Sequence, residues 1–258
     1  MGSPETLTVL QVTDTHLYSA ADTTMHGVCT QRSLEAVIDQ ALDESEPDVL
    51  LVSGDLAQVG EVMIYERFLS TIRARFEGPL LCVPGNHDLS EPFDEFFPKE
   101  ILNAKGWDIV GIDTHVDDRV EGVVSDAEFR RLNDLLNASI NQVLVVGHHG
   151  LVDVGTPWLD EHKISNSDKL LRALCSHNCV RGYVFGHVHQ EFYSVIGGVR
   201  LFATPSTCFQ FAPGAKKFKI DGEQPGYRWL MLNDGGTIDT YVSRLGQFDP
   251  VRDFTQIE

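Results

Sequence analysis

The sequence predicts an α/β fold with a sheet that is covered on both sides. Through the first two thirds of the chain, short runs of Val, Ile and Leu alternate with stretches that carry one apolar face in helical periodicity. The short runs are apolar at successive positions, which is typical of strands buried on both sides. In the last quarter the pattern changes to two strand hairpins. No linker, repeat or low-complexity segment divides the sequence, so we expect a single domain over residues 1–258.

The expected strands are short and apolar. In the alternating part they are 7–12, 49–53, 80–83, 109–112, 143–146 and 183–185. The two expected hairpins pair 192–196 with 199–203, and 227–232 with 237–243. The turns of both hairpins contain Gly-Gly, which adopts the positive φ that a tight turn requires.

Four stretches have the periodicity of helices with one buried face. They are 34–42, 65–76, 125–136 and 167–176, of which the last has the weakest pattern. The third begins at Ser125-Asp126-Ala127-Glu128, which reads as a capping box. In such a box the side chains of Ser125 and Glu128 each accept a hydrogen bond from the other's backbone N–H.

Composition excludes several functional classes. With 38 acidic and 20 basic residues the formal net charge is −18, which argues against nucleic-acid and membrane partners, since both require a basic surface. The apolar runs are too short to cross a bilayer, and residues 1–6 lack the basic segment of a secretion signal. The five cysteines include no CxxC pair and suit buried thiols. We therefore expect a cytoplasmic protein.

Metal-ligating residue types follow five of the expected strands. Because the carboxyl ends of strands meet at one edge of an open α/β sheet, side chains there converge even when they are remote in sequence. Four of the five motifs have a glycine just before the ligand type, which lets the backbone turn sharply and approach a bound group. Ligands of nitrogen and oxygen without cysteine favour Mn²⁺, Fe²⁺ or Zn²⁺. The motifs are Asp14-Thr15-His16, Gly54-Asp55, Gly85-Asn86-His87-Asp88, Gly147-His148-His149 and Gly186-His187-Val188-His189.

In this order the five motifs resemble those of the calcineurin-like metallophosphoesterases, whose pattern is D-x-H, G-D, G-N-H-D/E, G-H and G-H-x-H. The resemblance implies a four-layer αββα sandwich of two mixed sheets flanked by helices, with a site for two divalent metal ions per chain at the carboxyl ends of the strands. It also implies the ligands: Asp14, His16 and His189 for one ion, Asn86, His148 and His187 for the other, and Asp55 bridging both.

The resemblance assigns further roles in the loop after the third of these strands. It implies that Asn86 and His87 lie at the substrate phosphate, and that Asp88 orients His87. From the residues alone, Asp88 after a turn is equally suited to capping a helix. Histidine exchanges protons near neutral pH, so His87 is our candidate for the acid that protonates the leaving group.

Within this family the sequence is similar to the bacterial class III 3′,5′-cyclic nucleotide phosphodiesterases. The similarity implies hydrolysis of 3′,5′-cyclic AMP to 5′-AMP by in-line attack of a hydroxide that bridges the two metals. Gln58 stands where purple acid phosphatases have a tyrosine. Tyr227 and Arg228 either touch substrate or belong to a core strand. The subgroup motifs are Asp14-Thr15-His16-Leu17, Gly54-Asp55-Leu56-Ala57-Gln58, Thr204 to Cys208 with Gln210-Phe211, and Pro225 to Arg228.

Two other hypotheses are kept. A related enzyme would act on other small diesters, such as 2′,3′-cyclic nucleotides or glycerophosphodiesters. A non-catalytic scaffold of the same fold would have no need of all seven ligands and His87, which this chain retains. The sequence indicates neither a base preference between cyclic AMP and cyclic GMP nor a choice between monomer and homodimer.

Overall fold

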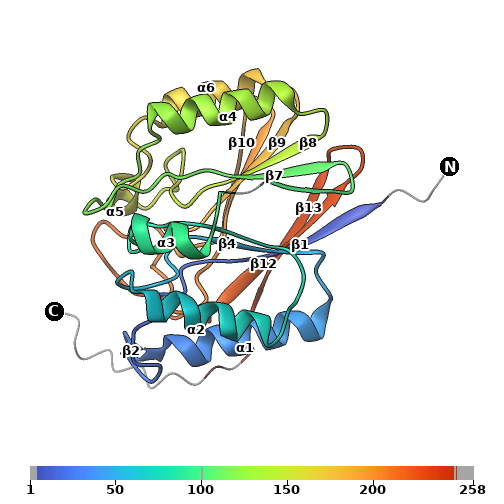
Figure 1. The fold of residues 1–258 in the computed structure, drawn as a ribbon. Helices are drawn as coiled ribbons and strands as arrows, with labels where there is room; N and C mark the ends of the chain where they lie inside the picture. The colour runs from blue at the N-terminus through green and yellow to red at the C-terminus, as the bar shows by residue number, and fades with distance from the viewer. Residues whose placement is uncertain (1–4, 100, 247, 249–258) are drawn as a thin grey trace.

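The computed structural model describes residues 5–99, 101–246 and 248. Two sheets lie face to face at the centre of the protein, and helices cover the outer face of each sheet (Figure 1). Both sheets contain parallel and antiparallel pairs. The expected four-layer αββα sandwich of two mixed sheets is therefore confirmed.

The first sheet has the strand order β13-β12-β1-β4-β5, and the second has the order β10-β11-β9-β8-β7-β6. The first comprises β1 (Thr6–Val12), β4 (Val49–Ser53), β5 (Leu80–Val83), β12 (Gly226–Asn233) and β13 (Ile238–Arg244). The second comprises β6 (Ile101–Ala104), β7 (Trp107–Gly111), β8 (Gln142–Val146), β9 (Val180–Phe185), β10 (Phe192–Ile196) and β11 (Val199–Ala203). A two-stranded hairpin, β2 (Thr24–Met25) and β3 (Val28–Cys29), stands apart from both.

Helices α1 (Thr30–Glu44), α2 (Val62–Arg73) and α3 (Ser90–Phe96) contribute to the apolar layer on the first sheet. Helices α4 (Asp126–Ala138), α5 (Pro157–Asp160) and α6 (Ser167–Ser176) contribute to the layer on the second. A third layer fills the space between the sheets. Successive strand residues face different layers. In β1, Val9 faces the other sheet and Leu10 faces the helices. In β8, Leu144 likewise faces the other sheet and Val145 faces the helices.

The capping box at the start of α4 is only half formed. Ser125 Oγ accepts a hydrogen bond from the Glu128 N–H at 3.1 Å, as expected. The Glu128 carboxylate instead accepts one from the N–H of Asp113 at 3.0 Å and pairs with Arg131. The reciprocal bond to Ser125 was therefore wrongly expected, because these two partners occupy the carboxylate.

The sequence patterns missed several short elements, namely α3, α5, β6 and the β2–β3 hairpin. Each is too short to establish a periodicity. Among the described residues no helix is long and apolar enough to span a bilayer. The segment 1–4, on which part of the expectation about the N-terminus depends, lies outside the described residues.

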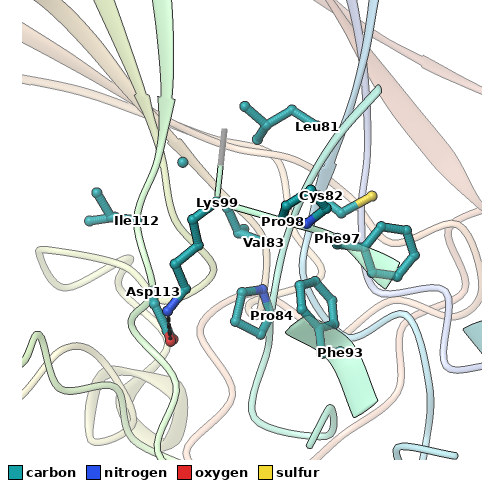
Figure 2. A pocket seen from close by; sticks show the side chains of 11 residues that line it. Leu81, Cys82, Val83, Pro84, Phe93, Phe97, Pro98, Lys99, Ile112 and Asp113 are labelled. Atoms are coloured by element: carbon teal, nitrogen blue, oxygen red, sulfur yellow. Dashed lines mark hydrogen bonds and ion pairs between the residues drawn. The ribbon is translucent and has the colours of Figure 1, made fainter. Parts of the chain in front are cut away.

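A small apolar hollow lies between β5, α3 and the end of β7. Leu81, Phe93 and Ile112 are among the side chains that line it, and Lys99 Nζ lies 3.0 Å from the Asp113 carboxylate in its wall (Figure 2). None of the seven candidate metal ligands is among its described lining residues. This hollow is therefore separate from the site predicted at the strand ends.

Candidate metal centre

The carboxyl ends of β1, β4 and β5 in the first sheet, and of β8 and β9 in the second, carry the five motifs of the predicted site. Their ligand-type side chains form overlapping groups in which nitrogen and oxygen atoms lie within 4.8 Å of one another. Three such groups are Asp14 with His16 and His189, Asp14 with Asp55 and His148, and His148 with His149 and His187. Segments remote in sequence thus converge as expected.

The backbone at the site is strained. Five of the seven candidate ligands have a positive φ, between 45° and 64°, a conformation that side-chain-bearing residues rarely adopt. Such residues persist where the surrounding structure holds them, and they cluster at functional sites. Here the Asp14 N–H donates a hydrogen bond to Gly54 O and the His16 N–H donates one to Asp55 O, both at 3.0 Å, and these bonds stabilise the local conformation. The five residues are Asp14, His16, Asp55, His187 and His189.

Two of the motif glycines are required by close approach. A Cβ atom on Gly85 would collide with the Asp55 carboxylate, and one on Gly186 would collide with Thr13 and Asp14. The missing side chains therefore allow the loops after β5 and β9 to press against the carboxylates that follow β4 and β1.

Three imidazoles are held in a defined orientation by oxygen atoms at Nδ1. His16 Nδ1 lies 2.8 Å from Gln58 Oε1, His148 Nδ1 lies 2.7 Å from Ser53 O, and His189 Nδ1 lies 2.8 Å from Phe209 O. An oxygen acceptor at that distance places the ring proton on Nδ1 and leaves the Nε2 lone pair free to bind a metal.

The Nε2 atoms meet near the carboxylates. Those of His16 and His189 lie only 3.2 Å apart. Two lone pairs facing each other at this distance repel, and a cation between them would relieve that repulsion. His189 Nε2 also lies 3.3 Å from Asp14 Oδ1. Asp55 Oδ2 lies 3.3 Å from His148 Nε2 and 3.7 Å from His16 Nε2, between the two imidazoles.

The remaining nitrogen and oxygen ligands adjoin His148. Asn86 Oδ1 lies 3.2 Å from His148 Nε2 and 2.9 Å from His187 Nδ1. His187 Nε2 is buried and has no hydrogen-bond partner among the described residues. A buried imidazole with an unpartnered nitrogen beside an amide oxygen fits a metal site. His149 differs, because Thr114 Oγ1 at 2.8 Å and Val120 O at 3.0 Å occupy both of its ring nitrogens.

The pKa values in this cluster make Asp55 ionised and His16 neutral, whereas His148 is protonated until a metal binds. Burial by itself raises the pKa of Asp55, but the neighbouring His148 and His87 outweigh it and hold this pKa well below its ordinary value. Burial lowers the pKa of His16 to about 3, so its ring is neutral at neutral pH. Burial also acts to lower the pKa of His148, but Asp55 dominates and raises it to about 9. A metal at His148 would displace that proton.

The half-buried His87 lines the cavity beside this cluster. Its backbone N–H donates to Asp55 Oδ1 at 2.8 Å, and its Nδ1 lies 3.1 Å from the carbonyl oxygen of Gln58. The described contacts therefore make Gln58 O, rather than Asp88, the partner that orients the ring.

Asp88 instead holds two loops together. Its carboxylate accepts hydrogen bonds from the N–H groups of Gly85, Leu56 and Ala57, at 2.9–3.2 Å, and from the Tyr65 hydroxyl at 3.0 Å. It joins the loop after β5 to the loop after β4, and it does not cap α3, whose N-cap is Leu89. Burial, with Asp55 nearby, raises the pKa of Asp88 to about 6.

The candidate ligands open onto a cavity of about 570 Å³, a volume that includes its mouth. Ligand cavities of roughly 300–1,000 Å³ hold drug-sized molecules. The lining includes polar site residues, among them His16, Asp55, Asn86, His87 and His187. It also includes apolar and mostly aromatic side chains, among them Met25, Trp158, Phe209, Phe211 and Phe218.

Residues 7–191, well over half of the chain, match the family of calcineurin-like phosphoesterases. This chain is a calcineurin-like phosphoesterase. The match spans all five motifs, so the resemblance noted in the sequence is confirmed.

This phosphoesterase has relatives of similar length. It is 34% identical over 244 residues to the 3′,5′-cyclic adenosine monophosphate phosphodiesterase CpdA of Pseudomonas aeruginosa, covering 92% of this chain and 89% of that protein. It is 34% identical over 253 residues to the CpdA of Escherichia coli K12, covering 94% and 92%. A dimetal phosphatase from Danio rerio has a similar fold, with a TM-score of 0.64, 14% identity, and coverage of 92% and 99%.

The subgroup motifs of the phosphoesterase support the site from outside it. Ser206 Oγ donates to the carbonyl oxygen of Asp14 at 2.8 Å. Arg228 is buried in β12 and donates to Ala203 O at 2.9 Å and Thr204 Oγ1 at 3.1 Å. Tyr227 packs in the apolar layer on the first sheet. Neither Tyr227 nor Arg228 is among the described residues that line the site cavity, so the core-strand alternative holds for both.

Sequence reasoning missed two features of the phosphoesterase site. Gln58 contacts His16 through its side chain and His87 through its backbone, and the only sequence signal was its position three residues after Asp55. The apolar residues of the cavity lining are far apart in sequence, from Met25 to Phe218, so no local motif reveals them.

Proposed function

We propose that this phosphoesterase hydrolyses 3′,5′-cyclic AMP to 5′-AMP at a centre of two divalent metal ions. The observation that carries the proposal is the convergence of buried imidazole nitrogens, carboxylates and an amide oxygen into two adjoining groups that share Asp55. The substrate follows the names of the CpdA relatives, which align with more than nine tenths of this chain.

In this proposal each ion has three ligands of its own and Asp55 in common. When bound, two such ions would supply positive charge to a phosphodiester and lower the pKa of a water molecule toward ~7 for attack on phosphorus. The nitrogen and oxygen donors suit Fe²⁺, Mn²⁺ or Zn²⁺. The proposed ligands are Asp14, His16 and His189 for the first ion, and Asn86, His148 and His187 for the second.

His87 is the proposed proton donor. Hydrolysis of a 3′,5′-cyclic phosphate to the 5′-monophosphate releases the ribose 3′-oxygen, which is a poor leaving group until it is protonated. The bond from Nδ1 to Gln58 O keeps one ring proton on that nitrogen, so a protonated His87 carries its transferable proton on Nε2. The neutral Asn86 amide next to it contributes a ligand without cancelling positive charge at the site.

The test is a comparison of kcat/KM in metal-reconstituted protein for cyclic AMP, cyclic GMP, 2′,3′-cyclic AMP and a glycerophosphodiester. We expect the 3′,5′-cyclic nucleotides to be the best substrates. Good turnover of another diester without turnover of cyclic AMP would replace the proposal with the alternative of a phosphodiesterase for other small diesters. Absence of hydrolysis of every diester at full metal occupancy would favour the non-catalytic scaffold.

The location and assembly of the protein stay predictions. All five cysteines are free thiols, which suits the reducing cytoplasm. Size-exclusion chromatography with light scattering distinguishes a monomer from a homodimer.

A further inference from the structure

The apolar side chains in the cavity lining supply neither a metal ligand nor a transferable proton. Three of these side chains, Trp158, Phe211 and Phe218, form what we call the aromatic wall. Trp158 lies in α5, Phe211 follows β11, and Phe218 lies in the exposed loop after it. Phe218 retains 44% of its surface exposed, so its ring is accessible from solvent.

Phe211 contacts Trp158 and Phe218 edge to face, and Trp158 and Phe218 are tilted against each other. The centroid of Trp158 lies 4.9 Å from that of Phe211 and 5.6 Å from that of Phe218, and the two phenylalanines are 5.5 Å apart. Phe211 also stacks on the proposed ligand His189, with centroids 4.4 Å apart. The wall is thus continuous with the metal centre, and a molecule whose phosphate lies at the ligands extends over aromatic surface.

The wall offers π-faces and few hydrogen-bonding groups. The phenylalanines have no polar side-chain atom, and Trp158 Nε1 is buried without a hydrogen bond to any described residue. Flat aromatic groups stack on such surfaces, and stacking of a nucleobase on an aromatic side chain contributes about 1–3 kcal/mol whatever the base. A nucleotide is a phosphate ester that carries a flat aromatic base.

We propose that the aromatic wall binds the base of the nucleotide substrate and recognises it by stacking rather than by hydrogen bonds to its edge. This inference rests on the proposed function for its substrate class. It adds that adenine and guanine are accepted alike, because both present a π-face of similar size.

The test measures the contribution of the base separately from the reaction with cyclic AMP. The assay follows hydrolysis of bis(p-nitrophenyl) phosphate by the metal-loaded protein, and AMP, GMP and ribose 5-phosphate are compared as inhibitors. AMP and ribose 5-phosphate differ only in the base. We expect AMP and GMP to inhibit similarly, and both about 5- to 150-fold more tightly than ribose 5-phosphate, the ratio equivalent to stacking.

Phe218→Ala and Trp158→Ala should reduce this ratio, and Tyr241→Ala should not. Tyr241 is a matched control, since it is an aromatic residue with 46% exposure and is not among the described lining residues of the cavity. For cyclic AMP, Phe218→Ala should lower kcat/KM mainly through KM. AMP should also quench tryptophan fluorescence, because Trp107 and Trp229 are fully buried and Trp158 is the tryptophan at the cavity.

Equal inhibition by AMP and ribose 5-phosphate in the wild type, or an unchanged ratio in both wall variants, would overturn the inference. A strong preference between AMP and GMP would also overturn it, since stacking alone does not produce one. If the enzyme cleaves diesters but not cyclic AMP, the proposed function fails, and the inhibitor ratio still decides whether the wall binds a base.

Discussion

Gln58 offers the sharpest test of how the metal centre is assembled. Its side-chain Oε1 holds His16 at Nδ1, whereas its backbone oxygen holds His87. Gln58→Ala therefore removes the first contact and keeps the second. Loss of an outer hydrogen-bond partner of a metal ligand costs about 10- to 100-fold in metal affinity, equivalent to roughly 1.4–2.8 kcal/mol.

The expected result is selective. We predict that Gln58→Ala lowers the affinity for the first ion, whose proposed ligands include His16, by about 10- to 100-fold. The affinity for the second ion should stay nearly unchanged, and so should kcat for cyclic AMP at saturating metal. Competition with a calibrated chelator measures both affinities. Gln58→Glu is the matched variant, because its carboxylate can still accept the hydrogen bond from His16 and should keep most of the affinity. Unchanged affinities in Gln58→Ala, or equal losses at both sites, would refute the reasoning.

Three further predictions follow from the same contacts. His87→Ala should leave metal content intact and lower kcat for cyclic AMP by roughly 10²–10⁴, but cost much less for bis(p-nitrophenyl) phosphate, whose leaving group needs no proton; equal losses would show that His87 binds phosphate instead. Asp55→Ala should lose both metals in elemental analysis because its carboxylate lies between the two groups, so retention of one ion at full occupancy would contradict the shared role. Asp88→Ala leaves four hydrogen-bond donors without their acceptor and should lower the free energy of unfolding, measured by urea denaturation, by about 3–5 kcal/mol. Tyr65→Phe removes one of these donors and should cost only about 1 kcal/mol. A similar small loss for both variants would contradict the role of Asp88 in joining the two loops.

The residues themselves predicted most strands of the two large sheets and the convergence of the candidate site, whereas the pairing of two sheets in a sandwich came from the family resemblance. Strand ends are marked by apolar runs that stop at Gly or a polar residue, as at Val52 before Ser53-Gly54. Because parallel strands end at one edge, the residues that follow them are near one another whatever their separation in sequence. The helix 167–176 was predicted with the bounds that α6 has in the structure.

The partners that orient the site residues were beyond sequence reasoning. Two of the three oxygens at the imidazole Nδ1 atoms are backbone carbonyls, of Ser53 and Phe209, and every residue type has such an oxygen. The same applies to Gln58 O, which takes the place expected for Asp88 beside His87. Only the fold determines which carbonyl lies next to which ring.

The proposed ligands explain why polar groups are buried where two apolar sheets meet. Each ion would draw ligands from both sheets: the first from Asp14 and His16 after β1 and from His189 after β9, and the second from Asn86 after β5 with His148 after β8. Elsewhere Val, Leu, Ile and aromatic side chains hold the sheets together, but at this edge carboxylates lie close to the Nε2 atoms of imidazoles. Buried charge is costly unless it is paired or bound to a metal. Divalent cations would bind these groups from both sheets, so the ions proposed to act on a phosphodiester would also join the two halves of the fold.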